Sequence, residues 1–179
     1  ADYFFAAGAL LGIKAKVKNL HGTSMHGDKK FLSLLELMGC KVADEADGLA
    51  VYGNKTPKGI AANMNDFSDQ ALTLAAMAPF LSEPTDISGI GHIRKQECDR
   101  INAMAVNLKA MGVTVEERTD GIKIYPCKEI LPAKIETFND HRVAMSFAIA
   151  GLKSGKLTIE NPQCCKKTFE NFFEILERL

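Results

Sequence analysis

The sequence predicts an α/β fold built from repeated β-α-β-α-β-β units with three-fold pseudo-symmetry. Three observations indicate this fold. Helical and strand-like segments alternate along the chain, one helix–hairpin pattern occurs twice with the same internal spacing, and a shorter version follows it. Each repeat already contains two helices and a sheet, so the repeats are folding units of one domain rather than solenoid modules. We therefore expect a single domain over residues 1–179.

Cap and turn residues define the first copy. Its expected elements are an apolar helix at 3–11, a strand at 15–20 and a helix at 28–38. The second helix ends at Met38-Gly39, where glycine supplies the left-handed cap. Alternating strands then flank the Asp47-Gly48 turn, which is the pattern of a β-hairpin. No strand precedes the first helix, so we expect the N-terminus to be truncated.

The later copies follow the same order. The second is expected to contain a helix at 69–81, a strand at 85–88, an amphipathic helix at 96–111 and a hairpin around Asp120-Gly121. The third is expected to contain a helix at 141–152, a strand at 156–160 and a helix at 168–179. Short extended segments before Ser68 and Asp140 would open these two copies. The order predicts parallel strand pairs as well as hairpins, with equivalent helix starts converging on one edge.

Composition and charge exclude several classes of protein. The chain has 22 basic and 22 acidic residues, and 46% of its residues are hydrophobic, which is ordinary globular composition. The longest nearly apolar run, 71–81, is far shorter than the ~20 residues of a membrane helix, so no membrane span is expected. Zero net charge disfavours general nucleic-acid binding.

The cysteines indicate a reducing compartment. They are five in number, contain no Cys-x-x-Cys pair and include a vicinal pair, Cys164-Cys165, that suits a disulfide framework poorly. We therefore expect free thiols and a cytoplasmic location. No residues have the spacing of a metal site, so no metal is expected.

Basic residues gather at expected helix starts in the last two copies. They are Arg94, Lys95 and Arg100, and then His141, Arg142, Lys166 and Lys167. A cation in a first helical turn opposes the helix dipole at about 0.3–1 kcal/mol, whereas a helix N-terminus with Arg and Lys attracts phosphate or carboxylate. A converging site for an anionic ligand is therefore predicted. Taken singly, Asp69 is equally a first-turn acid and Glu97 with Arg100 a surface pair, His141 is more often a capping residue, and Lys166-Lys167 is usually a solvated start.

Four motifs carry a family resemblance. The segment Asn139-Asp140-His141-Arg142-Val143-Ala144-Met145 closely resembles the Asn-Asp-His-Arg-x-Ala-Met signature of the EPSP synthase family of 3-phosphoshikimate 1-carboxyvinyltransferases. Residues 94–100 resemble that family's Arg-x-Lys-Glu-Ser-Asp-Arg motif. Ser68-Asp69-Gln70-Ala71 stands where the family has Pro-Asp-Ala-Ala, and Lys167-Thr168-Phe169 where it has Lys-Ser/Thr-Phe. The resemblance covers the whole chain.

The resemblance implies a fold and a reaction. The fold would be one domain of the enolpyruvyl transferase fold, which is similar to an inverse α/β barrel, and the chain would be the C-terminal half of a two-domain enzyme. The reaction would transfer the enolpyruvyl group of phosphoenolpyruvate to the 5-hydroxyl of shikimate-3-phosphate, in the shikimate pathway to chorismate and the aromatic amino acids, without cofactor or metal. The partner would be the missing N-terminal domain. This half should be inactive alone, because preorganisation requires both walls of the cleft.

The resemblance also implies roles for individual residues. Asp69 would take the proton of the 5-hydroxyl and contact shikimate-3-phosphate, and Glu97 with His141 would assist proton transfer at the enolpyruvyl carbon. Phosphoenolpyruvate would be bound by Arg100, Arg142 and Lys167, and shikimate-3-phosphate also by His92 and Gln96. The family usually has Lys where this chain has Gln96, so either the neighbouring Lys95 or the Gln96 amide would replace that contact.

Other functions stay open on the residues alone. A UDP-N-acetylglucosamine enolpyruvyl transferase would share the fold and the donor. A non-catalytic module that binds anions or RNA 3′ ends would share a repeated α/β scaffold, but zero net charge and the absence of Trp disfavour it. A structural half whose only partner is the missing domain is compatible with either enzyme.

Overall fold

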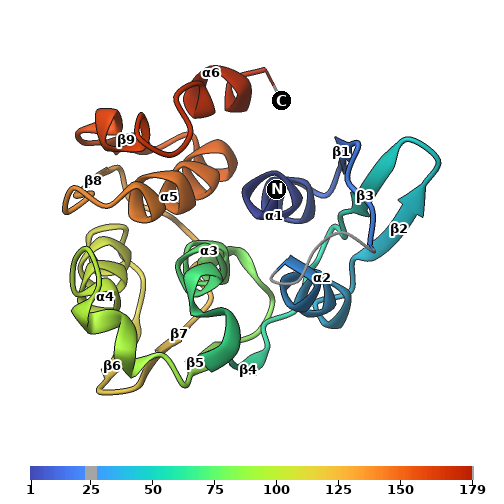
Figure 1. Ribbon diagram of the computed structural model, residues 1–179. Helices are drawn as coiled ribbons and strands as arrows, with labels where there is room; N and C mark the ends of the chain where they lie inside the picture. Colours follow the sequence, from blue (N-terminus) through green and yellow to red (C-terminus); the bar gives the residue numbers. More distant parts are fainter. Residues whose placement is uncertain (23–27, 179) are drawn as a thin grey trace.

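The computed structural model describes residues 1–22 and 28–178, and the architecture that it shows is a ring of three α/β units (Figure 1). Each unit supplies one inner helix, and these are α1 (Asp2–Leu11), α3 (Ala71–Met77) and α5 (His141–Ser154). Each also supplies one outer helix, and these are α2 (Asp28–Leu37), α4 (Arg100–Ala110) and α6 (Phe172–Leu176). The inner helices pack against one another, so the expected pseudo-symmetry and fold class are confirmed.

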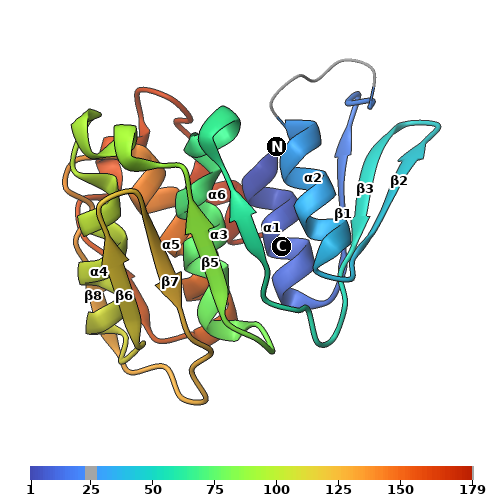
Figure 2. The ribbon, with the colours of Figure 1, turned by 90° about the horizontal axis from the view of Figure 1, so that it is seen from below.

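The strands lie outside the helices (Figures 1 and 2). The first sheet is antiparallel, in the order β1-β3-β2, with β1 (Lys14–Lys18), β2 (Lys41–Glu45) and β3 (Gly48–Tyr52). The second has the order β4-β5-β7-β6, with β4 (Ala61–Asn63), β5 (Thr85–Ser88), β6 (Val115–Arg118) and β7 (Gly121–Ile124). The third pairs β8 (Ala133–Ile135) with β9 (Leu157–Ile159). The β4–β5 and β8–β9 pairs are parallel and the hairpins antiparallel, as predicted.

Small residues let the inner layers approach closely. Alanines line the buried faces of all three inner helices, and Thr73 of α3 and Ser146 of α5 pair their buried hydroxyl groups at 3.1 Å. At Gly8, an added Cβ would lie 2.4 Å from the Ala15 Cβ, so only glycine permits this approach of α1 to β1. The buried apolar side chains form one continuous core among the helices and the inner sheet faces.

An aromatic cluster joins the last unit to the first. Phe172 of α6 packs edge-on against Tyr3 of α1, with ring centroids 5.6 Å apart, and is 6.0 Å from Phe4. Phe169 and Phe173 complete the cluster at 5.7 and 5.3 Å from Phe172. These contacts close the ring of three units around α1.

Several expected helix boundaries were wrong. The single helix expected over 69–81 is divided. It begins in the last two residues of the 3-10 helix η1 (Asn65–Gln70), continues as α3 and ends in the 3-10 helix η2 (Ala78–Phe80). Pro79 has no amide hydrogen to continue the α-helix. The helix expected from 96 begins at Arg100, because the Asp99 carboxylate accepts the Asn102 amide at 3.0 Å and caps it there. The helix expected over 168–179 is confined to α6, with η4 (Pro162–Cys165) before it.

Across residues 1–22 and 28–178, we find no helix with the length and apolarity needed to cross a membrane.

Candidate active site

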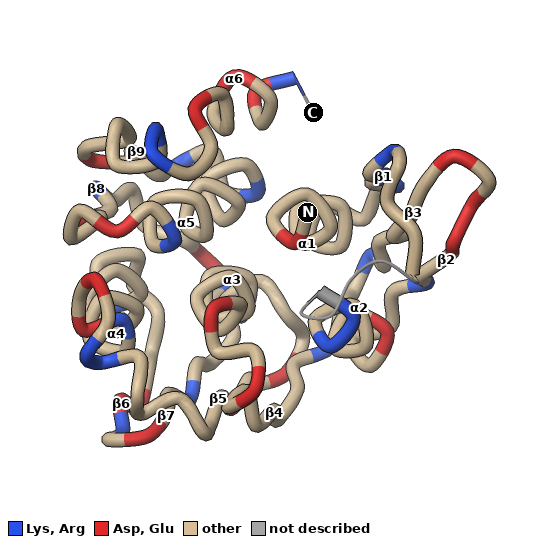
Figure 3. The backbone as a smooth tube through the Cα atoms, in the orientation of Figure 1, with Lys and Arg blue, Asp and Glu red and all other residues tan. Residues whose placement is uncertain are grey.

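The starts of the inner helices meet at one edge of the ring, as the repeat predicts. Asp69, the last residue but one of η1, forms an ion pair with Arg142 of α5, and its Oδ2 lies 2.8 Å from Arg142 Nη2. Gln70 donates through Nε2 to the Asp2 carboxylate of α1 at 2.9 Å. Acidic and basic positions are interspersed along the described chain, and both signs occur at this edge (Figure 3). Polar groups from all three units therefore converge here.

Arg100 is the hub of this edge. Its side chain is only 1% exposed, and its Nη1 donates to Asp69 Oδ1 at 3.1 Å and to the side-chain oxygen Oε1 of Gln96. Its Nη2 donates to Glu97 Oε2 at 2.6 Å, and its Nε to Asp140 Oδ2 at 2.8 Å. Burial alone would lower the pKa of Arg100, but these carboxylates raise it above its usual value. The guanidinium therefore stays charged and fixes the three carboxylates around it.

Asp140 is the residue of this hub to which sequence reasoning assigned no role. It is fully buried, and its Oδ1 accepts the Arg142 backbone amide at 2.8 Å, so it caps α5 while it binds Arg100. Burial would raise the pKa of Asp140, but the hydrogen bonds and charge of Arg100 lower it further than burial raises it. The available signal was its position directly before a helix, where Asp is a preferred cap.

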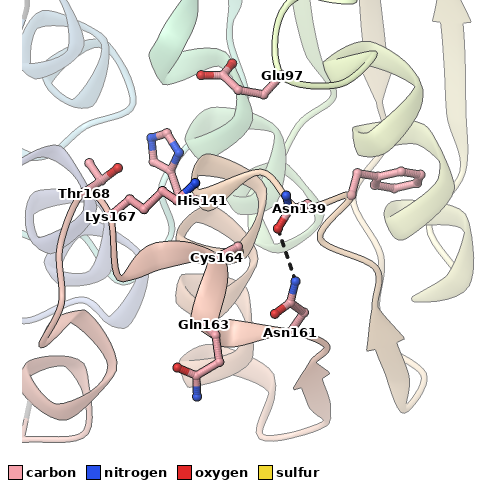
Figure 4. A pocket seen from close by; sticks show the side chains of 9 residues that line it. Glu97, Asn139, His141, Asn161, Gln163, Cys164, Lys167 and Thr168 are labelled. Carbon is pink, nitrogen blue, oxygen red and sulfur yellow. Dashed lines mark hydrogen bonds between the residues drawn. The ribbon is translucent and has the colours of Figure 1, made fainter.

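A pocket of about 600 Å³ opens beside the hub (Figure 4). It is lined by Glu97, Phe138, Asn139, His141, Asn161, Gln163, Cys164, Lys167 and Thr168. In Figure 4 the His141 and Lys167 side chains lie near each other, Glu97 lies across from them, and the Asn139 and Asn161 amides pair at 3.4 Å. The structure thus brings three of the predicted residues into one pocket, and adds an amide pair that the sequence did not suggest.

Backbone conformation shapes this pocket. Phe138, Asn139 and Asn161 all have left-handed φ values, of 53°, 57° and 49°. Such values are uncommon for residues other than glycine, although Asn tolerates them best. These turns direct the chain so that η4 and the start of α5 face each other across the pocket.

The pocket combines a cation with a neutral imidazole. Lys167 is exposed, and within the described part of the chain we find no ion pair that involves it. Burial lowers the pKa of His141, and although Asp140 raises it and Arg142 lowers it again, the net shift is downward. At neutral pH His141 is therefore uncharged, so it can accept a proton, while Lys167 can hold an anion.

The remaining predicted residues lie outside this pocket. His92 is in η3 (Gly91–Lys95), and its Nε2 lies 2.8 Å from the Ser68 hydroxyl oxygen, which ties η3 to η1. Gln96 lines a neighbouring pocket of about 290 Å³ together with Asp69 and η1 residues. Gln96 and Glu97 are consecutive but face different pockets. Asp69 lines the same pocket as Gln96 and is bound to Arg100.

Four predicted helix-start cations have other placements. Arg94 and Lys95 lie in η3 rather than in a first α-helical turn, and Lys167 lies in the turn between η4 and α6. Lys166 faces a separate groove of about 530 Å³ beside α6. The expectation that these residues oppose a helix dipole was therefore wrong, and loops place the cations instead.

Comparison with solved structures defines the class of the fold. EPSP synthase from Acinetobacter baumannii matches with a TM-score of 0.85 at 26% identity, over 99% of this chain and 44% of that chain. The enolpyruvyl transferase NikO from Streptomyces tendae has the same fold, with a TM-score of 0.76 at 20% identity over 99% of this chain. The fold is thus that of the enolpyruvyl transferases.

Sequence comparison then defines the family. Residues 1–176 match the EPSP synthase (3-phosphoshikimate 1-carboxyvinyltransferase) family. The 3-phosphoshikimate 1-carboxyvinyltransferase of Nostoc punctiforme is 47% identical over 99% of this chain, and the chloroplastic enzyme of Arabidopsis thaliana is 38% identical over all of it. The chain belongs to the EPSP synthase family. It spans 42% of the first relative's length and 36% of the second's.

Proposed function

We propose that this chain forms one wall of an enzyme that transfers the enolpyruvyl group of phosphoenolpyruvate to the 5-hydroxyl of shikimate-3-phosphate, with release of phosphate. Family membership supports the reaction. The observation that carries the assignment to these residues is the convergence of Asp69, Glu97 and His141 around the Arg100 hub, beside the exposed Lys167. Acid and base groups thus stand next to cations, as a transfer through a charged tetrahedral intermediate requires.

Asp69 is the proposed base for the acceptor hydroxyl. Its carboxylate is 43% exposed, so a substrate can reach it, and two guanidinium groups orient it from Arg100 and Arg142. A base held in one orientation before substrate arrives gives up little freedom in the transition state. His92 and Gln96, at the neighbouring pocket side of the edge, are the proposed contacts to shikimate-3-phosphate. The Gln96 side-chain oxygen accepts from Arg100 and so holds this side chain at the site, which favours its amide nitrogen over Lys95 as the replacement for the family lysine.

Lys167 and Arg142 are the proposed direct contacts to phosphoenolpyruvate. Both are accessible, whereas Arg100 is buried with its donors engaged by residues of this chain. Arg100 can contact phosphoenolpyruvate directly only if Glu97 or Gln96 releases one of its Nη atoms. Otherwise it contributes only its positive charge to the site. Glu97, with its carboxylate 52% exposed, and the uncharged His141 are the proposed pair for proton transfer at the methylene carbon. The pair takes a proton from solvent, gives it to that carbon as the tetrahedral intermediate forms, and takes it back as phosphate leaves.

A second domain of the same polypeptide is the proposed opposite wall. This chain spans 42% and 36% of the length of the two relatives, so more than half of each relative lies outside the aligned segment and can form that domain. Without it the isolated chain should not turn over. All five cysteines are free, which supports the proposed cytoplasmic location.

A chimera tests this function. Residues 1–179 replace the aligned segment of the Nostoc punctiforme relative, and phosphate release is measured with both substrates and with each alone. We expect release only with both substrates, and loss of about 10²-fold or more in Asp69→Asn, since general acid–base groups contribute about 10²–10⁴-fold. Asp86→Asn is the matched control, because Asp86 is an acid outside both pockets that binds Arg118 at 2.8 Å.

Two results would contradict the proposal. A folded chimera that releases phosphate no faster than its Asp69→Asn variant would remove the catalytic assignment. Turnover by residues 1–179 alone would remove the two-wall assignment.

A further inference from the structure

The proposed function gives no role to Arg94, the first residue of the 94–100 motif. Its guanidinium points to the β6–β7 turn rather than to either pocket. Its Nε donates to Thr119 O at 3.1 Å, and its Nη2 to Arg118 O at 2.7 Å and Glu117 Oε1 at 3.0 Å. Its Nη1 donates to both Asp99 oxygens, at 3.0 and 2.8 Å. All three guanidinium nitrogens are thus engaged by groups of this chain, as the fork of donors on Arg allows.

These contacts close the base of a short loop. Arg94 and Asp99 form an ion pair across residues 95–98, and this loop holds Gln96 and Glu97. Asp99 also caps α4, whose first residue is Arg100. One guanidinium therefore joins the β6–β7 turn, the loop base and the start of the helix that carries the hub.

The segment on the other side of η3 is fastened to the same turn. The Asp120 carboxylate accepts the Gly91 amide at 2.6 Å and the Gly89 amide at 3.2 Å. Asp120 thus holds the segment that leads into η3, and Arg94 holds the segment that leaves it. The β6–β7 turn, which contributes no residue to the lining of either pocket, is therefore the support of the loop.

We infer that Arg94 is a positioning residue that sets where Glu97 and Gln96 stand relative to Arg100. The consequence for catalysis rests on the proposed function, whereas the consequence for the loop does not. Lysine at position 94 would keep the charge but has three donors on a single nitrogen and no planar fork. It therefore cannot hold Asp99, Glu117 and the two turn carbonyls together.

The loop itself is tested in the 179-residue chain by nuclear magnetic resonance. In Arg94→Lys we expect the amide resonances of residues 95–98 and the Gln96 side-chain amide to shift or broaden. The control is Arg118→Lys on the same hairpin, whose guanidinium binds Asp86 at 2.8 Å, and it should leave these resonances in place. Glu117→Gln keeps an acceptor for Arg94 Nη2 but removes the charge of one of its partners, and it should shift the same resonances less. Unchanged resonances of 95–98 in Arg94→Lys would overturn the inference.

The catalytic consequence is tested in the chimera by a double-mutant comparison. We expect Arg94→Lys to lower kcat roughly 10- to 100-fold, because a displacement of about 1 Å can cost about 10²-fold. If Arg94 acts through Glu97, the Arg94→Lys/Glu97→Gln variant should be no more than about twofold slower than Glu97→Gln alone. Losses that multiply would show that Arg94 acts elsewhere and would overturn the inference. An inactive parent chimera would count against the proposed function, and the resonances would still decide the positioning role.

Discussion

The buried Arg100–Asp140 pair allows a quantitative prediction. Both side chains are removed from solvent, with exposed fractions of 1% and 0%, and their Nε and Oδ2 atoms lie 2.8 Å apart. In Asp140→Asn the side chain keeps its shape and can still cap α5, since Asn is as good a cap as Asp. The amide keeps that cap only with its nitrogen toward Arg100 Nε, so the change removes both the charge and the acceptor at Oδ2, and leaves the guanidinium less compensated in the interior.

The magnitude follows from the remaining partners. Removal of one member of a buried ion pair costs about 3–5 kcal/mol. Asp69 and Glu97 stay bonded to the same guanidinium, so we expect the lower end, about 3 kcal/mol. Asp140→Ala also loses the cap and should cost about 1 kcal/mol more. The exposed pair of Arg118 and Asp86 gives the contrast, because such pairs contribute about 0–1 kcal/mol.

Urea unfolding followed by circular dichroism measures these differences. We compare Asp140→Asn, Asp140→Ala and the control Asp86→Asn at pH 7, and expect an order of destabilisation in which the control changes least. If Asp140→Asn unfolds within about 1 kcal/mol of the parent, as the control should, then the buried charge is compensated by other means and the reasoning is refuted.

Three further predictions concern the site and its ionisation. In the chimera, Lys167→Met should raise the KM for phosphoenolpyruvate at least about tenfold, because it removes a charge-assisted contact of about 1.5–3 kcal/mol. The control Lys166→Met should leave this KM unchanged. Equal KM values for the two variants would contradict the assignment of Lys167. The pKa of Asp140 is lower when folded, so its stabilisation is complete above the ordinary value of 3.8 and is lost as pH falls toward the folded pKa. Acid unfolding should therefore begin below that value and should depend less on pH in Asp140→Asn. Burial raises the pKa of Cys98 and of Cys165 to about 12, so both should react with a disulfide reagent at pH 8 far more slowly in the folded chain than in urea, as peptide mapping can measure.

Local chemistry made much of the fold predictable. The Asp47-Gly48 and Asp120-Gly121 turns and the Met-Gly helix ends are short-range signals, and the hairpins β2–β3 and β6–β7 lie where these signals place them. Helix starts were less predictable because caps compete within a few residues. Asp99, rather than an earlier residue, begins α4, and a helical pattern near the C-terminus produced only α6.

The sequence by itself determined the repeat, the α/β class and the family, because periodicity, turn residues and motifs are properties of neighbouring positions. It also identified the chemical types at the site, among them Asp69, Glu97, His141 and Lys167. Only the tertiary structure decided which of these groups face a pocket. It buried Arg100 against Asp140, turned Arg94 toward the β6–β7 turn and placed Asn139 beside Asn161. The direction of a charged side chain depends on partners from other units, and residues 40 positions apart, as Arg100 and Asp140 are, leave no periodic signal of their contact.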